Sequence, residues 1–179
     1  DISEKVGKVK STYLFGHSMG GLVSLQTLLE YSNNFEAKLD GVILSNPCIK
    51  PKLTLPLWLN KGLESTSSIF SNVRVMSLYM GFDLCRDVKL AREFNSDQLV
   101  SHFMTVGLLK SLMASSKRVR QMAYYIKTPI IFLLSGEDRI VDTDFTQLFS
   151  KGISKDLCTL RLYSDMFHEL SNDLGREKV

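Results

Sequence analysis

The sequence predicts an α/β fold with a mostly parallel sheet, and three features of the chain indicate this. Short, nearly continuous apolar runs at 13–15, 41–45 and 129–135 are typical of strands covered on both faces. Segments with apolar residues at helical spacing follow the first and the third run. A glycine or an Asn-Pro pair ends each run, as expected of strands that stop at turns. Strands alternating with helices favour parallel pairing, so we expect an α/β-type sheet with helices on both faces and, as argued below, a helical cap insertion.

The first run leads into Gly-His-Ser-Met-Gly-Gly at 16–21, a layout that predicts an exposed serine on a sharp strand-to-helix turn. We expect glycine at 16 and 20 because side chains on either side of Ser18 would collide where the backbone turns back. The helix that follows aims its first free N–H, that of Met19, at any oxyanion formed beside Ser18. An ordinary glycine-rich turn is the alternative interpretation.

The other core elements are predicted from the same patterns. The first helix is expected over about 20–31, where leucines recur at helical spacing. A second helix is expected before the last strand, because Phe145, Leu148 and Phe149 share one helical face. The last strand, 158–163, alternates leucines with polar side chains, so we expect it at an edge of the sheet.

A long excursion between the second and third strands, 47–127, exceeds the length of an ordinary loop. Helical spacing, as at Leu99/Phe103 and over 119–126, predicts a helical cap over the carboxyl ends of the strands. The chain would then consist of core segments at 1–46 and 128–179 with the cap between them.

Five of the seven methionines lie in the cap. Unbranched, polarizable side chains suit a wall that adapts to flexible acyl chains, and filling the cap's own core is the alternative. The five are Met76, Met80, Met104, Met113 and Met122.

Composition excludes several classes of protein. The 179 residues are 44% hydrophobic and 23% charged, as in one globular domain with a core of its own. The formal charge of +3, with basic and acidic residues mixed, does not indicate nucleic-acid binding. Three widely spaced cysteines without a C-x-x-C pair indicate neither disulfides nor a zinc site, and they favour a reducing compartment such as the cytoplasm.

An exposed serine needs an imidazole to take its proton, and the chain has three histidines. His17 adjoins Ser18, but neighbouring side chains on a tight turn diverge, so we expect it to pack or hydrogen-bond below the turn. His102 falls within the predicted cap helix. His168 follows the last strand directly, at the carboxyl rim where open α/β sheets place their sites. We therefore predict His168 as the base, with a capping histidine as the alternative.

The base in turn needs a carboxylate, and Asp138 follows the third strand at the same rim. Glu137 and Asp142 compete for this role, although Asp142 is better placed to cap the helix that follows. The order along the chain is then Ser18, Asp138, His168. Nucleophile, acid, base is the order of the α/β-hydrolase fold.

With these residues in place, the chain resembles α/β-hydrolases of the monoacylglycerol lipase/lysophospholipase family. The matching segments cover most of its length. They are Leu-Phe-Gly-His-Ser-Met-Gly-Gly at 14–21, Leu-Ser-Asn-Pro at 44–47, Phe-Asn-Ser-Asp-Gln-Leu-Val at 94–100, Leu-Ser-Gly-Glu-Asp-Arg-Ile-Val-Asp at 134–142 and Tyr-Ser-Asp-Met-Phe-His-Glu-Leu at 163–170.

The resemblance implies Ser18 as nucleophile, Asp138 as acid, His168 as base and the Met19 N–H as one oxyanion donor. It also implies a lid over an acyl channel and hydrolysis of a glycerol or phospholipid ester, with no cofactor or metal. In the family, several strands and a His-Gly oxyanion turn precede the elbow, but here only 17 residues precede Ser18. We therefore expect the N-terminal part of the fold to be absent from this sequence and the strand at 13–15 to lie at an edge.

Three functions follow as hypotheses. The first is a serine esterase acting on lipids; the second is a soluble carboxylesterase, thioesterase or peptidase on the same fold. The third is a ligand-binding protein without turnover. Peripheral membrane contact through Lys117, Arg118 and Arg120 is a further hypothesis, and its alternative is a solvated helix face. The sequence does not indicate an oligomeric state.

Overall fold

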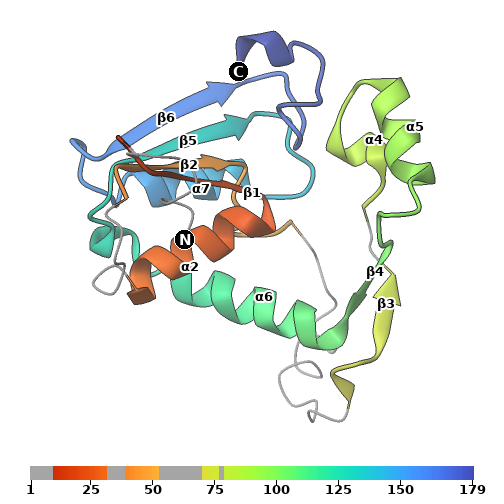
Figure 1. Cartoon of the computed structure of the whole chain (residues 1–179), viewed down its shortest axis with the longest axis horizontal. Helices are drawn as coiled ribbons and strands as arrows, with labels where there is room; N and C mark the ends of the chain where they lie inside the picture. Colours follow the sequence, from red (N-terminus) through yellow and green to blue (C-terminus); the bar gives the residue numbers. More distant parts are fainter. Residues whose placement is uncertain (1–9, 32–38, 53–69, 77–78) are drawn as a thin grey trace.

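Four parallel strands form the sheet around which the chain is arranged (Figure 1). The computed structural model describes residues 10–31, 39–52, 70–76 and 79–179. The strands are β1 (Tyr13–His17), β2 (Gly41–Ser45), β5 (Ile130–Ser135) and β6 (Cys158–Tyr163). Their order is β1-β2-β5-β6, and each neighbouring pair is parallel. The predicted α/β class with a parallel sheet is thereby confirmed.

The central strands carry the core, and the outer strands are the edges of the described sheet. Leu44 of β2 pairs in register with Phe132 of β5, and both side chains are fully buried. On β1, by contrast, Tyr13 and Phe15 are each 62% exposed. The predicted edge positions of the first and last strands are therefore confirmed for the part of the chain that the structure describes.

Three helices pack against one face of this sheet. Helix α2 (Met19–Tyr31) follows β1, α6 (Val106–Val119) packs against α2, and α7 (Thr143–Ser150) follows β5. Their buried side chains join those of β2 and β5 in one core cluster. We expect helices on both faces, and α2, α6 and α7 lie on the face of Leu44 and Phe132 (Figure 1). Strand burial alternates accordingly, since Ile43 and Ile131 of the opposite face are only partly buried.

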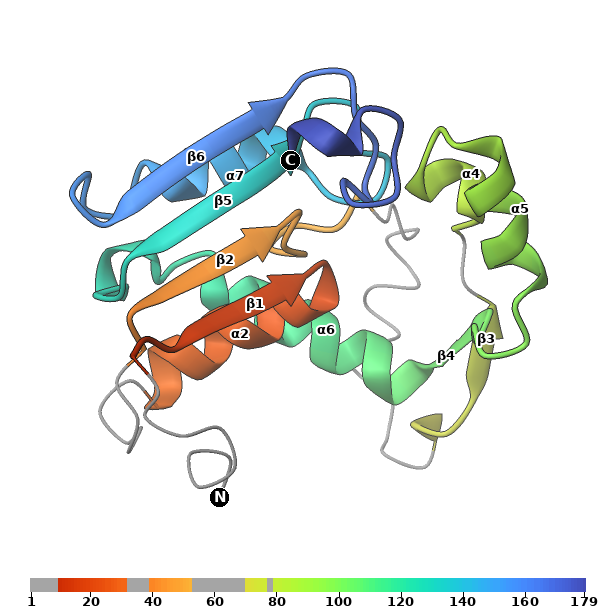
Figure 2. The same cartoon turned by 45° about the horizontal axis from the view of Figure 1, so that its top comes forward.

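A second group of elements lies beside the sheet (Figure 2). Strand β3 (Arg74–Met76) pairs antiparallel with β4 (Phe103–Thr105), and between them come α4 (Gly81–Leu84) and α5 (Val88–Ser96). The described residues also include the short 3-10 helices η2 (Ala123–Tyr125) and η3 (Arg176–Lys178).

The helical spacing predicted at 99–104 and 119–126 is wrong in detail. The Asp97 carboxylate accepts a hydrogen bond of 2.8 Å from the Leu99 N–H, a local turn that competes with helix, and Leu99 is 94% exposed. Phe103 then begins β4. Between Val119 and Ile130, the helical residues are those of the single turn η2. A prediction from periodicity alone therefore assigned a strand and a loop to helix.

Part of the predicted cap region contacts the core directly. Val119 of α6 is fully buried in the core cluster, and Ser116 Oγ donates a hydrogen bond of 2.6 Å to the Ile49 carbonyl. The division of the chain into 1–46, 47–127 and 128–179 remains a prediction. Across the described ranges, no helix combines the length and the apolar character that crossing a bilayer requires.

Candidate active site

Ser18 occupies a strained position at the junction of β1 and α2. Its φ is 52°, in the left-handed region that costs a non-glycine residue roughly 1–2 kcal/mol. Backbone hydrogen bonds hold it there: the Ser18 N–H donates to Ser45 O at 3.0 Å, and Ser18 O accepts from Cys48 N at 2.9 Å. Such a turn raises the hydroxyl above the end of the sheet, as the sequence predicts.

Close contacts explain two of the glycines around Ser18, but not the same two that we expect from the sequence. A Cβ on Gly16 would lie 2.8 Å from the Gly20 carbonyl oxygen, so the predicted steric requirement is confirmed there. A Cβ on Gly20 would meet no described atom within 4 Å, so the same explanation is wrong for Gly20. The second close contact falls on Gly21 instead, whose Cβ would lie 2.7 Å from Pro47 Cβ. The loop after β2 presses against α2 at that point.

His168 and Asp138 meet Ser18 in one hydrogen-bonded chain. His168 Nε2 lies 2.8 Å from Ser18 Oγ, and His168 Nδ1 lies 2.7 Å from Asp138 Oδ2. The side chain of His168 is 2% exposed and that of Asp138 0%. The three side chains come from the ends of β1, β5 and β6, where the parallel strands deliver them to one rim. This arrangement lets the imidazole accept the serine proton while the carboxylate holds the ring.

Hydrogen bonds and burial distinguish Asp138 from Glu137 and Asp142, the other candidates for the carboxylate that orients His168. Asp138 Oδ1 accepts hydrogen bonds from the N–H groups of Ile140 at 2.7 Å and Val141 at 2.9 Å, which leaves Oδ2 for the imidazole. Glu137 is exposed. Asp142 caps α7 by accepting from Phe145 N at 2.8 Å, as predicted. Burial favours a higher pKa for Asp142, but hydrogen bonds from Lys50 and Phe145 outweigh it and lower the pKa.

The Met19 N–H belongs to the first turn of α2, directly after Ser18. A helix offers no acceptor of its own to its first N–H groups, so this donor is available to an oxygen beside Ser18. Its use as an oxyanion donor is part of the proposal below.

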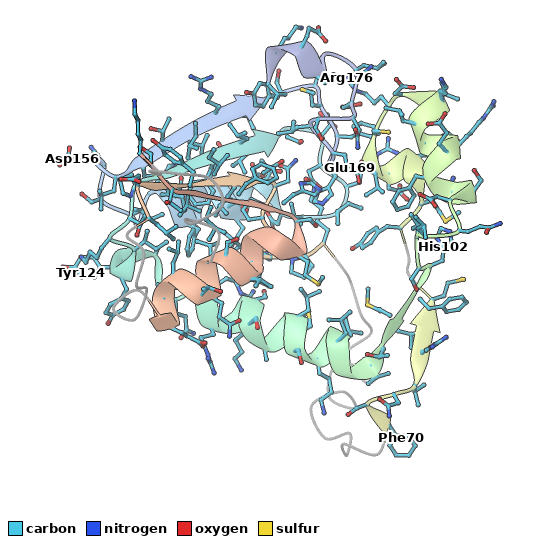
Figure 3. All side chains as sticks on the ribbon, viewed as in Figure 1. Phe70, His102, Tyr124, Asp156, Glu169 and Arg176 are labelled. Carbon is cyan, nitrogen blue, oxygen red and sulfur yellow. The ribbon has the colours of Figure 1, made fainter. Side chains whose placement is uncertain are left out.

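The other two histidines, His17 and His102, make contacts of a different kind. His17 Nδ1 lies 3.2 Å from Ser45 Oγ, and its ring centroid is 4.9 Å from that of His168. Burial, and then repulsion from His168, lower the pKa of His17. His102 lies between α5 and β4, edge-on to Phe94 at 6.3 Å between ring centroids (Figure 3).

Asn46 is a site residue that the sequence analysis treated only as a strand terminator. It is fully buried, and its φ is 42°. Its Nδ2 donates to Ser135 Oγ at 2.7 Å and to the His168 carbonyl at 2.6 Å, and its Oδ1 accepts from Ser135 N at 2.8 Å. The Ser135 hydroxyl in turn donates to the Phe167 carbonyl. The signal available in the sequence was an asparagine, a residue that tolerates the left-handed region, at the carboxyl end of a buried strand.

One buried thiol lies next to the serine turn. The Cys48 N–H contacts the Ser18 carbonyl, and burial followed by the Asp138 charge raises the pKa of the Cys48 thiol to about 11. Among the described side chains, no group of three or more histidines, cysteines and carboxylates is arranged to hold a metal ion.

Comparison with known proteins shows the family of this chain. The Hydrolase_4 family, described as serine aminopeptidase, S33, matches residues 1–175. The chain belongs to this family. Within its range, the Hydrolase_4 match includes all three hydrogen-bonded residues, Ser18, Asp138 and His168.

Individual relatives of this Hydrolase_4 chain include lipid hydrolases. Phospholipase YtpA of Bacillus subtilis is 29% identical over 93% of this chain and 64% of its own length. Rat monoglyceride lipase is 26% identical over 97% of this chain and 58% of its own length. The chain thus spans less than two thirds of these relatives. The crystal structure of Paleococcus ferrophilus monoacylglycerol lipase superimposes with a TM-score of 0.84 at 21% identity, covering 99% of this chain and 66% of that one. This confirms the α/β-hydrolase fold.

Proposed function

We propose that this chain carries the catalytic residues of a serine hydrolase that cleaves carboxylic esters of lipids, monoacylglycerols or lysophospholipids, through an acyl-enzyme. The observation that supports this most directly is the continuous chain from Ser18 Oγ through His168 to Asp138, with contacts of 2.8 and 2.7 Å. A serine hydroxyl is a weak nucleophile until such a base is in contact with it.

Each proposed role follows from an atom in that chain. Ser18 Oγ attacks the ester carbonyl while His168 Nε2 takes its proton, and Asp138 stabilises the imidazolium. The Met19 N–H donates to the oxyanion of the tetrahedral intermediate. His168 then gives its proton to the departing alcohol, leaving the acyl group on Ser18. Water, deprotonated by the same imidazole, attacks the acyl-enzyme and releases the fatty acid.

Two observations support a lipid as the acyl donor. Relatives named for monoglyceride and phospholipid cleavage match most of this chain. Four of the five cap methionines, all but Met122 beside η2, are also available to an adaptable wall, because none of them is fully buried. Met76 is 67% and Met80 48% exposed, and the others are partly buried.

A peptidase is the second candidate, because the matching family is described as serine aminopeptidase. The hydrogen-bonded chain is equally suited to amide and ester carbonyls, so a substrate comparison has to separate them. We would therefore assay glycerol and phospholipid esters of long and short acyl chains beside aminoacyl amides.

The first test is intact-mass analysis after incubation with a fluorophosphonate. We expect one adduct on the wild-type chain, none on Ser18→Ala, and an undiminished adduct on Ser154→Ala, which changes an exposed serine. An adduct that survives Ser18→Ala would overturn the assignment of the nucleophile. Failure of a folded wild-type chain to label would favour the ligand-binding alternative.

Membrane contact through Lys117, Arg118 and Arg120, at the end of α6, is a separate proposal. Arg118 pairs with Glu30 of α2, and the Arg120 guanidinium lies 5.9 Å from the centre of the Phe145 ring. Lys117 is exposed. Co-sedimentation with anionic and neutral vesicles tests the idea, and equal binding to both would remove a role for these charges.

A further inference from the structure

A buried carboxylate, that of Asp173, belongs to the loop that carries His168. We call residues 164–174 the His168 loop. Asp173 is 0% exposed, and its Oδ2 accepts a hydrogen bond of 2.6 Å from the N–H of Phe167, the residue before His168. Its Oδ1 accepts from Leu174 N at 2.9 Å. Asp173 thus ties the two sides of the His168 loop together.

The charge of Asp173 is matched by an arginine from another part of the fold. Arg86 belongs to residues 79–97, which we call the α4–α5 unit. Arg86 Nε lies 3.0 Å from Asp173 Oδ2, and the Arg86 N–H donates to Oδ1 at 2.6 Å. Its Nη2 donates to the Leu174 carbonyl at 2.6 Å. Arg86 is held in place by its own unit, because the next residue, Asp87, is the N-cap of α5.

The backbone before and after His168 is therefore fixed from the α4–α5 unit. The N–H of Phe167 is held by Asp173, which Arg86 holds in turn. The N–H of Glu169 donates a hydrogen bond of 2.8 Å to the carbonyl of Leu84 in α4. A shift of the α4–α5 unit would move both peptides, and with them the imidazole.

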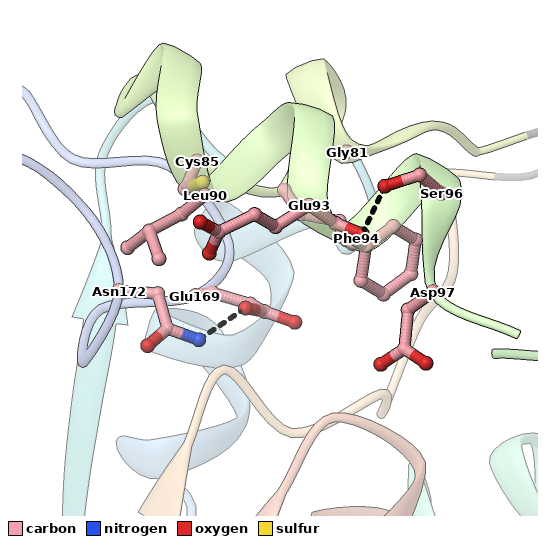
Figure 4. A pocket seen from close by; sticks show the side chains of 10 residues that line it. Gly81, Cys85, Leu90, Glu93, Phe94, Ser96, Asp97, Glu169 and Asn172 are labelled. Atoms are coloured by element: carbon pink, nitrogen blue, oxygen red, sulfur yellow. Dashed lines mark hydrogen bonds between the residues drawn. The ribbon is translucent and has the colours of Figure 1, made fainter. Parts of the chain in front are cut away.

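These polar contacts matter because the two parts do not pack solidly against each other. A cavity of about 350 Å³ lies between them, lined by Leu90 and Phe94 of α5 and by Glu169 and Asn172 of the His168 loop (Figure 4). An apolar interface would hold the loop by burial alone. The interface between the α4–α5 unit and the His168 loop is partly hollow, so hydrogen bonds and the Arg86–Asp173 ion pair have to hold the loop in position.

We infer that Arg86 and Asp173 are positioning residues that set the distance between His168 Nε2 and Ser18 Oγ. The inference rests on the proposed function, since the distance matters for catalysis only if Ser18 is the nucleophile. Removing Arg86 leaves the Asp173 carboxylate buried without its counter-charge, so the His168 loop must rearrange to hydrate it. A misplacement of a reacting group by about 1 Å costs on the order of 100-fold in rate.

The test compares Arg86→Gln, Arg86→Lys and Asp173→Asn with Arg176→Gln as the matched control. Arg176 pairs with Asp87 at 3.4 Å on the same side of the molecule, but its side chain is half exposed. It contacts Asp173 through its backbone N–H, which donates to the Asp173 carbonyl at 3.2 Å and which the substitution keeps. We expect kcat for an ester substrate to fall about 10- to 100-fold in Arg86→Gln, with KM changed less than about threefold. Arg86→Lys should recover part of the loss, and Arg176→Gln should stay within about twofold of wild type.

A second readout separates this inference from the proposed function. The proton between His168 Nδ1 and Asp138 should give a downfield NMR resonance that His168→Ala abolishes, whether or not the protein turns over an ester. We expect this resonance to shift or broaden in Arg86→Gln and to be unchanged in Arg176→Gln. A folded Arg86→Gln protein with wild-type kcat and resonance would overturn the inference. Should that variant fail to fold, Arg86→Lys decides the question by the same two measurements.

Discussion

The side-chain amide of Asn46 donates a hydrogen bond of 2.6 Å to the carbonyl oxygen of His168, a residue 122 positions later in the chain. The same amide pairs with both the hydroxyl and the N–H of Ser135 at the end of β5. One side chain thereby connects the carboxyl ends of β2 and β5 to the backbone of the proposed base. Because Asn46 is fully buried, no water replaces these bonds when they are removed.

Replacing Asn46 should therefore affect both stability and reactivity. We expect Asn46→Ala to lower the free energy of unfolding by about 2–4 kcal/mol, because buried partners lose their hydrogen bonds and alanine is strained at positive φ. Asn46→Gly should lose about 1 kcal/mol less, because glycine accepts that φ. Fluorophosphonate labelling should slow equally in both variants, since both lack the amide. Unfolding in urea and labelling kinetics provide the two measurements, and equal labelling of Asn46→Ala and wild type would contradict the role.

Gly16 and Gly20 form a matched pair with opposite expected results. At Gly16 an added Cβ would lie 2.6 Å from Ser24 Oγ and 2.8 Å from the Gly20 carbonyl oxygen. Gly16→Ala should cost about 1–3 kcal/mol or more, because the backbone oxygen has no room to move. Gly20→Ala adds its methyl to open space in the first turn of α2 and should stabilise the protein by about 0.5–1 kcal/mol. Thermal and urea unfolding of the two variants test this, and a destabilised Gly20→Ala would contradict it.

His17 should make stability depend on pH below 6.5. Its pKa is lowered by burial and by the neighbouring His168, so the unfolded chain takes up a proton more readily than the folded one. Stability is then unaffected by this group above the ordinary pKa of 6.5 and is lost as the pH falls from there toward the lowered value.

The comparison that isolates His17 is with His17→Gln, which retains an amide for the Ser45 hydroxyl. Its unfolding free energy, measured from pH 7.5 to pH 5, should decline less than that of wild type over the acid part of the range. Parallel declines in the two proteins would show that other groups, Glu169 and Asp138 among those facing the ring, account for the pH dependence.

Cys48 should be inert toward alkylation in the folded protein. Only the thiolate reacts, and a pKa of about 11 leaves almost none of it at pH 8. We expect iodoacetamide to leave Cys48 unmodified at pH 8 over hours and to modify it within minutes in guanidinium, as followed by peptide mass analysis. Rapid alkylation of Cys48 without denaturant would mean that the turn at Ser18 opens readily, because the two backbones are hydrogen-bonded.

The core strands and the three proposed site residues could be predicted because local patterns determine them. Apolar runs identified β1, β2 and β5, and alternation identified β6. The position of His168 and Asp138 directly after strands was enough to bring them to the rim where Ser18 lies. Parallel strand order, rather than any long-range signal, made that inference work.

The other features of the fold and the site depend on tertiary contacts, which the hydrophobic periodicity of the sequence does not reveal. An Asx turn at Asp97 stands where the spacing of Leu99 and Phe103 predicts a helix. Gly20 and Gly21 look alike in sequence, and only the approach of Pro47 distinguishes them. Asp173 and Arg86, 87 residues apart, meet through tertiary packing and carry no motif spacing.

The wide separation of the three groups in the chain also constrains when the site can exist. Ser18 and His168 are 150 residues apart, and His168 and Asp138 are 30 apart. Chains are made from the amino end, so the serine emerges from the ribosome long before its imidazole partner. Until β6 has joined β5 and the loop beyond it has closed, the hydroxyl has no base beside it. Fluorophosphonate labelling of Ser18 therefore reports when the site has assembled. A nascent chain should not react, and the adduct should appear only in molecules that have completed the sheet.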